Sequence, residues 1–539
     1  MRNPLISRKT TAGPAKEPPP AKIPIIAVAI STLTVMAVCT LLQPCWETND
    51  DVAMSMIAHG YGAVAFGSPN IVFSNILWGY FVWFMPSLVG IPGYSVATLL
   101  SLIVAGGANL YALLRMEADL VCTVSYVVMF LLSFTFSPQF TVNSGLLTVA
   151  AVSLLLAYSR SRELHMLILA LVLAFGGFLI RTAEFLFVLG VALPLLPFRF
   201  LRTDRNAILA VTIFAVATAL ALYADMLVYR GTEWQAFNAL NSIRVSFTDY
   251  GVGNLLKARP DILARYGYSA TDIDLVTGFF FLDPRLADPS SLKSMVADLG
   301  SHTNFGSLAN VTAALKALFK PALLPFSGAA FLLALLFRNS RHLLAVLLFI
   351  AGIVGMGILG RPGVVRIYYA PLVLLTIVPI IGLSRIAPER MVARITLGLA
   401  LLGNVYWVTS KSRTMERQMK QIKQSIPYLQ KTPIIAWGGA FPYNLVYPVL
   451  SEPPQIRIRS LGSFSLAPYS RLVTEEAASA TTLAQIKSGA VVHFSATPDA
   501  MKAFAIYCQE RLAGSPVILK DESQPESLKL FEVQCKPRH

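Results

Sequence analysis

Three carboxylates follow directly on the first long apolar segment of the chain, in the stretch 46–51 with the sequence WETNDD. The residues after it can form a short helix, which Thr48 or Asn49 would cap. Asp50 and Asp51 then fall in the first turn of that helix, where unpaired N–H groups and the helix dipole favour ionised carboxylates. An ionised carboxylate can orient or deprotonate a hydroxyl group, so we take Asp50 and Asp51 as candidate catalytic residues. The alternative is that the pair only caps a surface helix.

The composition places this acidic stretch in a membrane protein. The chain has 539 residues, of which 55% are hydrophobic and 14% charged, and its mean hydropathy is +0.61. Apolar runs of about 20 residues recur from 25 to 409, as in helical proteins that cross a bilayer many times. The net charge of +15 gathers in the short loops between these runs. Short loops between spans carry Lys and Arg because these residues set the orientation of the protein in the membrane. The positive charge is therefore no sign of a nucleic-acid partner, and we expect none.

The charge pattern indicates how many apolar segments cross the membrane. If every candidate crossed, the basic loops 159–162, 199–205 and 338–341 would face outward, against the positive-inside rule. Segment 72–89 is interrupted by polar, glycine and proline residues, and its aromatic residues suit the membrane interface. If segment 72–89 does not cross the membrane, the basic loops face the cytoplasm. The remaining segments are 25–43, 94–114, 119–136, 141–158, 164–180, 183–198, 206–229, 319–337, 342–360, 366–384 and 391–409.

We therefore expect an α-helical polytopic protein with about eleven transmembrane helices, in the inner (plasma) membrane of a bacterium. The first segment is too long for a signal peptide and no small-residue cleavage site follows it, so we expect it to be retained. Residues 1–22 would then form a cytoplasmic tail. The transmembrane region would extend over 23–409, with extracytoplasmic loops at 44–93 and 230–318.

The character of the chain changes after residue 409. A basic amphipathic stretch leads into strand-like runs that alternate with polar or helical stretches, which predicts a small extracytoplasmic α/β domain over 410–539. The strand-like runs are 433–437, 491–494 and 528–533. Cys508 and Cys535 could pair in an oxidising compartment, but their spacing alone does not establish a disulfide. The sequence contains no CxxC or HExxH motif and no nucleotide-binding glycine fingerprint.

The predicted topology gathers polar residues at the outer face of the membrane. Arginine can hold a phosphate there, because its guanidinium fork binds two phosphate oxygens at once. Our candidates for substrate binding are Glu47, His59, Arg181, Glu184, Arg244, Asp249, Arg361, Arg366 and Tyr368. Arg181 and Glu184 are three residues apart and could instead form a structural salt bridge. Solitary histidines such as His59 and His302 are more often structural residues than ligands.

Carboxylates and arginines at an outer membrane face, where no nucleotide pool exists, suit the transfer of a sugar from a polyprenyl-phosphate carrier. The leaving group is a phosphate, so the reaction needs no strong general acid. It needs a carboxylate to activate the acceptor hydroxyl and cations to hold the phosphate. We expect a hexosyl- or pentosyltransferase with a polyprenyl-phosphate-linked sugar donor and a glycan, lipid or protein acceptor, in contact with membrane lipids.

This arrangement resembles the GT-C superfamily of integral membrane glycosyltransferases, such as protein O-mannosyltransferases, aminoarabinose transferases and oligosaccharyltransferases. The shared features are the retained first span, the acidic outer loop with Asp50 and Asp51, juxtamembrane helices, many spans and a soluble C-terminal domain. The resemblance implies that Asp50 or Asp51 acts as the base or helps to bind a divalent cation such as Mg²⁺ or Mn²⁺. The C-terminal domain has no WWD-type motif, which argues against oligosaccharide transfer to asparagine.

Two other functions suit part of the pattern. About eleven spans would suit a transporter or flippase for a lipid-linked sugar or polysaccharide, but the polar residues gather at one surface and no inverted repeat is visible. An O-antigen-type polymerase would use a large outer loop to bind glycan. The soluble C-terminal domain argues mildly against a polymerase.

Overall fold

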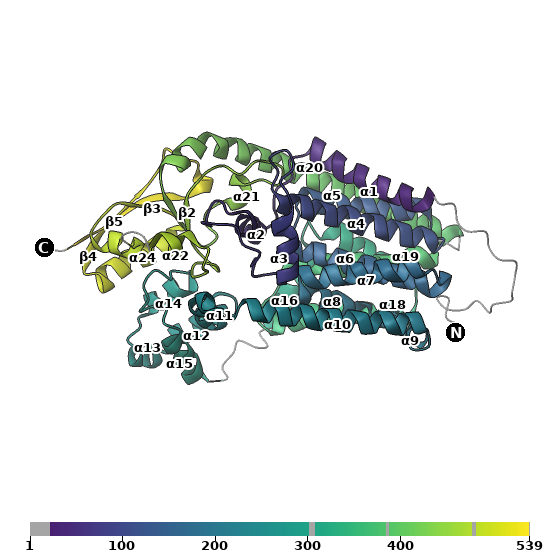
Figure 1. The fold of residues 1–539 in the computed structure, drawn as a ribbon, viewed down its shortest axis with the longest axis horizontal. Helices are drawn as coiled ribbons and strands as arrows, with labels where there is room; N and C mark the ends of the chain where they lie inside the picture. Colours follow the sequence, from purple (N-terminus) through teal and green to yellow (C-terminus); the bar gives the residue numbers. More distant parts are fainter. Residues whose placement is uncertain (1–21, 301–307, 384–386, 477–480, 538–539) are drawn as a thin grey trace.

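A bundle of long helices and a separate α/β region make up the molecule (Figure 1). The computed structural model describes residues 22–300, 308–383, 387–476 and 481–537. The predicted tail, apart from Lys22, and His302 lie outside these ranges. The bundle helices are α1 (Lys22–Leu41), α4 (Gly93–Arg115), α5 (Leu120–Phe136), α6 (Phe140–Ser161), α7 (Leu164–Ile180), α8 (Thr182–Ala192), α10 (Arg205–Val228), α17 (Leu324–Leu336), α18 (Ser340–Ile358), α19 (Val365–Leu383) and α20 (Ala387–Lys431).

A helix lies in each of the eleven segments that the sequence predicts to cross. Within the described residues, seven helices are long and apolar enough to cross a membrane by themselves. One more candidate is a pair of helices, Leu308–Phe319 and Leu324–Leu336, bent by 90° at a break. The others, α5, α7 and α8, are shorter apolar helices. Segment 72–89 contains only the nine-residue α3 (Ile76–Phe84), which is far below the roughly 20 residues of a span, in agreement with its exclusion.

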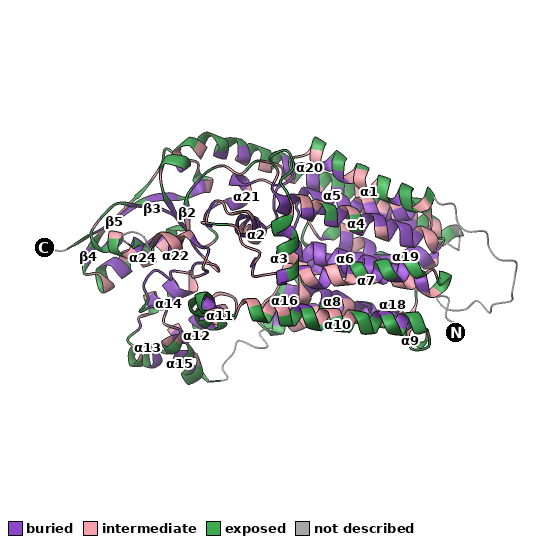
Figure 2. Cartoon of the chain, in the orientation of Figure 1, coloured by how far each residue is buried: buried purple, intermediate pink, exposed green. Residues whose placement is uncertain are grey.

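The helices at the surface of the bundle expose apolar side chains, and those at its centre bury them. On α10, Leu209, Val211 and Leu220 are each more than half exposed, whereas nearly all of α6 and α19 is buried. Figure 2 shows this contrast between the buried centre and the exposed outer helices. An apolar exterior around an apolar centre is expected where lipid replaces water as the solvent. The chain is thus a helical protein with several helices suited to a membrane.

The connections between bundle helices divide between the two ends of the bundle. α2 (Asn49–His59), α3 and the α/β region lie at one end, which we name the domain end (Figure 1). The described part of the N-terminus and α9 (Phe198–Leu201) lie at the opposite end. Ion pairs there join Arg162 to Asp204 at 3.0 Å and Arg394 to Asp119 at 2.6 Å. The loops that were predicted to share one side of the membrane therefore lie at the same end of the bundle. Which end faces the cytoplasm stays a prediction.

The C-terminal domain contains one five-stranded sheet in the order β2-β1-β3-β5-β4. β1 pairs in parallel with β2 and β3, whereas β5 pairs antiparallel with β3 and β4. The predicted runs correspond to β1 (Ile434–Trp437), β3 (Val492–Ser495) and β5 (Leu530–Pro537), and the sequence reading missed β2 (Ile458–Leu461) and β4 (Gly514–Lys520). The predicted domain boundary at 410 falls inside α20, which continues for 45 residues from the bundle to the sheet domain.

The long loop after α10 folds onto this domain. Its helices are α11 (Gln235–Thr248), α12 (Val252–Lys257), α13 (Pro260–Arg265), α14 (Ala270–Thr277) and α15 (Pro289–Leu299). They share one hydrophobic core with the sheet and with α24 (Pro498–Arg511). The indole of Trp437 donates to the carbonyl of Gly278 at 2.6 Å, and the Tyr507 hydroxyl donates to Asp283 at 2.9 Å. The loop and the C-terminal tail are therefore two parts of one packed unit.

A disulfide joins α24 to β5 within this unit. Cys508 and Cys535 are bonded, with their Cα atoms 5.9 Å apart. The bond agrees with an extracytoplasmic location, where disulfides persist. The remaining elements are α16 (Leu308–Lys316), α21 (Tyr443–Val446), α22 (Arg471–Glu476), α23 (Thr482–Lys487) and the 3₁₀ turns Leu193–Leu195, Thr232–Trp234, Ala317–Phe319 and Glu526–Leu528.

Candidate functional site

The acidic stretch forms the start of α2, as predicted, with Thr48 at the position before the helix and Gly60 after it in the left-handed conformation at φ 73°. The loop that follows α2 is joined to the sheet domain by backbone hydrogen bonds. The N–H of Ala65 donates to the carbonyl of Tyr469 at 2.9 Å, and the N–H of Arg471 donates to the carbonyl of Ala63 at 3.1 Å. α2 is therefore held between the bundle and the sheet domain.

The two aspartates at the start of α2 lie in different surroundings. Asp51 is 0% exposed, and its carboxylate accepts hydrogen bonds from the Thr48 hydroxyl at 2.8 Å, the Tyr94 hydroxyl at 3.0 Å and the backbone N–H of Phe140 at 2.9 Å. Burial raises the pKa of Asp51 to about 7, although the three hydrogen bonds oppose the rise. Asp51 thus ties α2 to the starts of α4 and α6. The prediction that it shares the catalytic role is not supported by this geometry.

Asp50 is 35% exposed and lines a cavity between α2 and the sheet domain. Its carboxylate oxygen is 3.5 Å from a guanidinium nitrogen of Arg366, in the first turn of α19. Burial raises the pKa of Asp50 above its ordinary value, and the positive charges of Arg366 and Arg181 act in the opposite direction. Of the two candidate bases, only Asp50 is accessible.

Four of the predicted arginines gather around Asp50 at the domain end. Arg181 lies at the junction of α7 and α8, Arg244 on α11, Arg361 in the turn after α18, and Arg366 on α19. The charges of Arg366, Arg181 and Arg244 act on Asp50, and those of Arg366 and Arg361 act on Arg181. We name these four residues the arginine cluster. They are separated widely in sequence, and the fold brings them together as predicted.

Two acidic groups accompany the arginine cluster. Asp249 pairs with Arg361 at 3.4 Å, and the Arg361 guanidinium also lies 5.6 Å from the ring centre of Tyr250. Glu184 is buried near Arg181, and its Oε1 has no hydrogen-bond partner among the residues that the structure describes. Four guanidinium groups therefore face the accessible carboxylates of Asp50 and Asp249, which leaves the surface of the site positively charged.

Three predicted binding residues lie outside this group. Glu47 pairs with Lys411 at 2.9 Å, and the ring of His59 accepts the backbone N–H of Tyr94 at 2.9 Å. Tyr368 is 0% exposed and donates to the carbonyl of Ala314 at 3.0 Å. These three side chains make contacts within the fold and lie away from the arginine cluster. His59 is therefore better explained as a structural residue than as a ligand.

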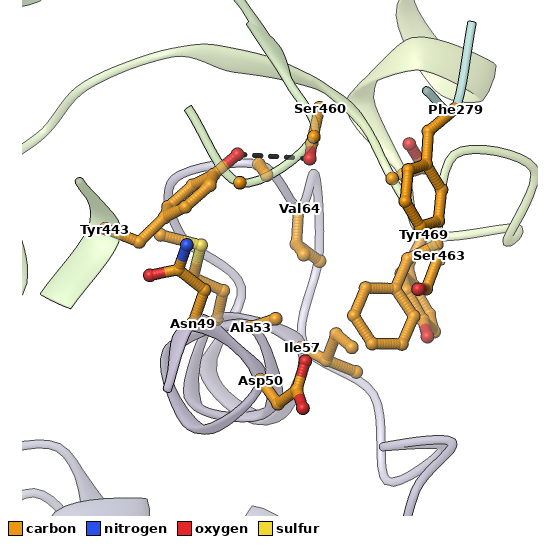
Figure 3. A pocket seen from close by; sticks show the side chains of 17 residues that line it. Asn49, Asp50, Ala53, Ile57, Val64, Phe279, Tyr443, Ser460, Ser463 and Tyr469 are labelled. Carbon is orange, nitrogen blue, oxygen red and sulfur yellow. Dashed lines mark hydrogen bonds between the residues drawn. The ribbon is translucent and has the colours of Figure 1, made fainter. Parts of the chain in front are cut away.

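The cavity beside Asp50 has a volume of about 180 Å³. Figure 3 shows Tyr443 on one side of it, Phe279 and Tyr469 on the other, and Asp50 on α2. Sequence analysis missed the lining residues outside α2. A signal existed, since the cavity touches Gly438-Gly439 and Gly462-Ser463, which follow the carboxyl ends of the parallel strands β1 and β2. Such strand ends are common ligand sites in α/β sheets.

A divalent cation shared by the two aspartates does not fit this geometry. Both oxygens of Asp51 are used as hydrogen-bond acceptors, and Asp50 faces the cationic groups of Arg366 and Arg181. Over the described ranges, no group of three His, Cys, Asp or Glu side chains is close enough to hold a metal ion. We derive no step through a metal at this pair.

The fold and site together define a helical protein with several candidate membrane spans, a small C-terminal sheet domain and a cationic site between them. Comparisons with protein-family models, with characterised proteins and with solved structures give no significant match. The function is therefore argued from the site itself.

Proposed function

We propose that the protein is a membrane glycosyltransferase, at the outer face of a bacterial inner membrane, which moves a sugar from a polyprenyl-phosphate carrier to an acceptor hydroxyl. The position of Asp50 carries this proposal. Its carboxylate lines the cavity and also lies 3.5 Å from Arg366 of the arginine cluster. A base and a phosphate-binding group are thus adjacent, as the reaction requires.

In the transfer, the acceptor oxygen bonds to the anomeric carbon of the sugar while the bond from that carbon to the phosphate oxygen breaks. The proton of the acceptor hydroxyl goes to Asp50. The electron pair of the broken bond leaves with the polyprenyl phosphate, whose added negative charge the arginine cluster stabilises. The partly exposed Arg366 and Arg361 can exchange their carboxylate partners for phosphate oxygens at little energetic cost.

The position of the site favours an enzyme over a transporter. Transporters bind their substrates near the middle of the membrane. The arginine cluster instead lies at the domain end, on α11 and at the ends of bundle helices. Exposed apolar side chains on α10 and α1 offer a lipid-facing surface along which a polyprenyl tail can extend.

The test uses the full-length protein in proteoliposomes with a panel of polyprenyl-phosphate hexoses and pentoses and a bacterial envelope glycan extract. Release of polyprenyl phosphate and labelling of the extract are both measured. Asp50→Asn should lower the transfer rate by about 10²–10⁴-fold, the usual contribution of a general base. Lys411→Gln, which removes a cation paired with Glu47 away from the cluster, is the control. Wild-type rates in Asp50→Asn would overturn the proposal.

A further inference from the structure

The cavity beside Asp50 has two walls of different origin. One wall is α2 with its following loop, including Asn49, Ile57 and Val64. The other is the sheet domain, which contributes the turns after β1 and β2. The second wall lies nearly 400 residues further along the chain, and the backbone bonds between residues 63–65 and 469–471 hold it against the first. The sheet domain is therefore part of the site.

The lining combines aromatic rings with hydroxyl groups. Phe279, Phe464 and Tyr469 supply ring surfaces, and the Tyr443 hydroxyl donates to the Ser460 hydroxyl at 3.0 Å (Figure 3). An apolar pocket with a few polar groups selects ligands that have both kinds of surface. A sugar ring has an apolar face of C–H groups and a rim of hydroxyls. The cavity volume of about 180 Å³ is below the range of drug-sized pockets, so it suits one ring and not an extended chain.

Asp50 lies between two different surroundings, the arginine cluster and the cavity. The arginine cluster pairs with Asp50 through Arg366, and the cavity reaches Asp50 from the sheet domain. In an inverting displacement at the anomeric carbon, which is the case proposed here, the acceptor attacks from the side opposite the leaving phosphate. We propose that the cavity binds one sugar ring of a glycan acceptor and presents its hydroxyl to Asp50. The assignment to acceptor, as opposed to donor, rests on the proposed function.

The test fills the cavity. Gly439 lines it, and a Cβ at this position would meet no atom within 4 Å, so a larger side chain is tolerated by the backbone. We expect the full-length wild-type protein in detergent to show saturation-transfer NMR signals with at least one of glucose, galactose, mannose and N-acetylglucosamine. Gly439→Leu should lower that signal at least tenfold. Gly398→Leu, at another glycine with open space, is the control and should bind like the wild type.

Thermal stabilisation by a polyprenyl-phosphate hexose distinguishes the remaining outcomes. Loss of this lipid's thermal stabilisation in Gly439→Leu, together with the hexose signal, would assign the cavity to the donor and overturn the acceptor assignment. A wild-type protein that gives no signal with any hexose would also overturn it. If Gly439→Leu loses hexose binding but no lipid-linked sugar is cleaved by the wild type, the proposed function fails and the cavity stands as a sugar site.

Discussion

Alanine at each of the two neighbouring aspartates should separate folding from activity. Asp51→Ala removes the acceptor of three hydrogen bonds; at buried residues it leaves the N–H of Phe140 unpaired and the hydroxyl of Tyr94 with only the weak acceptor Sδ of Met54, at 3.8 Å. Each orphaned buried donor costs about 1–3 kcal/mol, so the free energy of unfolding should fall by about 2–6 kcal/mol. That is a large share of the roughly 5–15 kcal/mol that stabilises a typical protein.

Asp50→Ala should have the opposite profile. It removes one ion pair, with Arg366 at 3.5 Å, between side chains that are 28% and 35% exposed. Such a pair is worth less than about 1 kcal/mol. The unfolding temperature should therefore stay close to that of the wild type, while sugar transfer falls at least about 100-fold.

The loss of stability is measured by thermal unfolding of the detergent-purified variants, followed by size-exclusion chromatography after heating. The loss of sugar transfer is measured in the proteoliposome assay. Asp51→Asn, which keeps the size of the side chain and one carbonyl acceptor, should retain most of the transfer activity. The reasoning is refuted if Asp51→Asn unfolds like the wild type but transfers no sugar, because Asp51 would then be the base.

Three further predictions concern the charge of the site, the disulfide and the topology. Because only the ionised form of Asp50 can accept a proton, the rate should fall as the pH drops through a pKa above the ordinary value of about 4. Arg366→Gln removes a charge that lowers this pKa, so the acidic limb of the pH–rate profile should move to higher pH; an unmoved limb would contradict the assignment. Cys535→Ser opens a loop with a sequence separation of 27 and should destabilise the unit formed by the 235–299 helices and the sheet domain by about 3 kcal/mol, measured as a lower unfolding temperature without reductant. In spheroplasts, a membrane-impermeant maleimide should label Ser523→Cys and not Thr203→Cys, both at exposed positions; labelling of both refutes the topology.

Much of the fold could be predicted from the sequence, because a helix that crosses a membrane needs about 20 mostly apolar residues. Apolar length predicted the bundle segments, and the charge of their connections predicted that 72–89 does not cross, in agreement with the nine-residue helix found there. The union of the 235–299 helices with the C-terminal sheet was not predictable, since it depends on packing between segments far apart in the chain. β2 and β4 were also missed. β2 is as short as β1, but its sequence Ile-Arg-Ser-Leu lacks the apolar run Ile-Ile-Ala-Trp that identified β1.

The site was predicted in part for a similar reason. The arginine cluster followed from topology, because the span count assigned all four residues to one face. The difference between Asp50 and Asp51 did not follow. Adjacent residues on a helix point about 100° apart, so one of them had to face the bundle, but only the packing of α2 against Tyr94 and Phe140 shows which.

The hydrogen bond from Arg471 to the carbonyl of Gly62 joins residues 409 apart. At roughly 5–20 residues per second, a ribosome takes on the order of 20–80 s to make the intervening chain. During this time the newly inserted first loop has no sheet domain to close against. A nascent chain therefore cannot complete the cavity until the sheet domain has been synthesised, and any truncation that stops before the sheet removes one wall of the cavity beside Asp50.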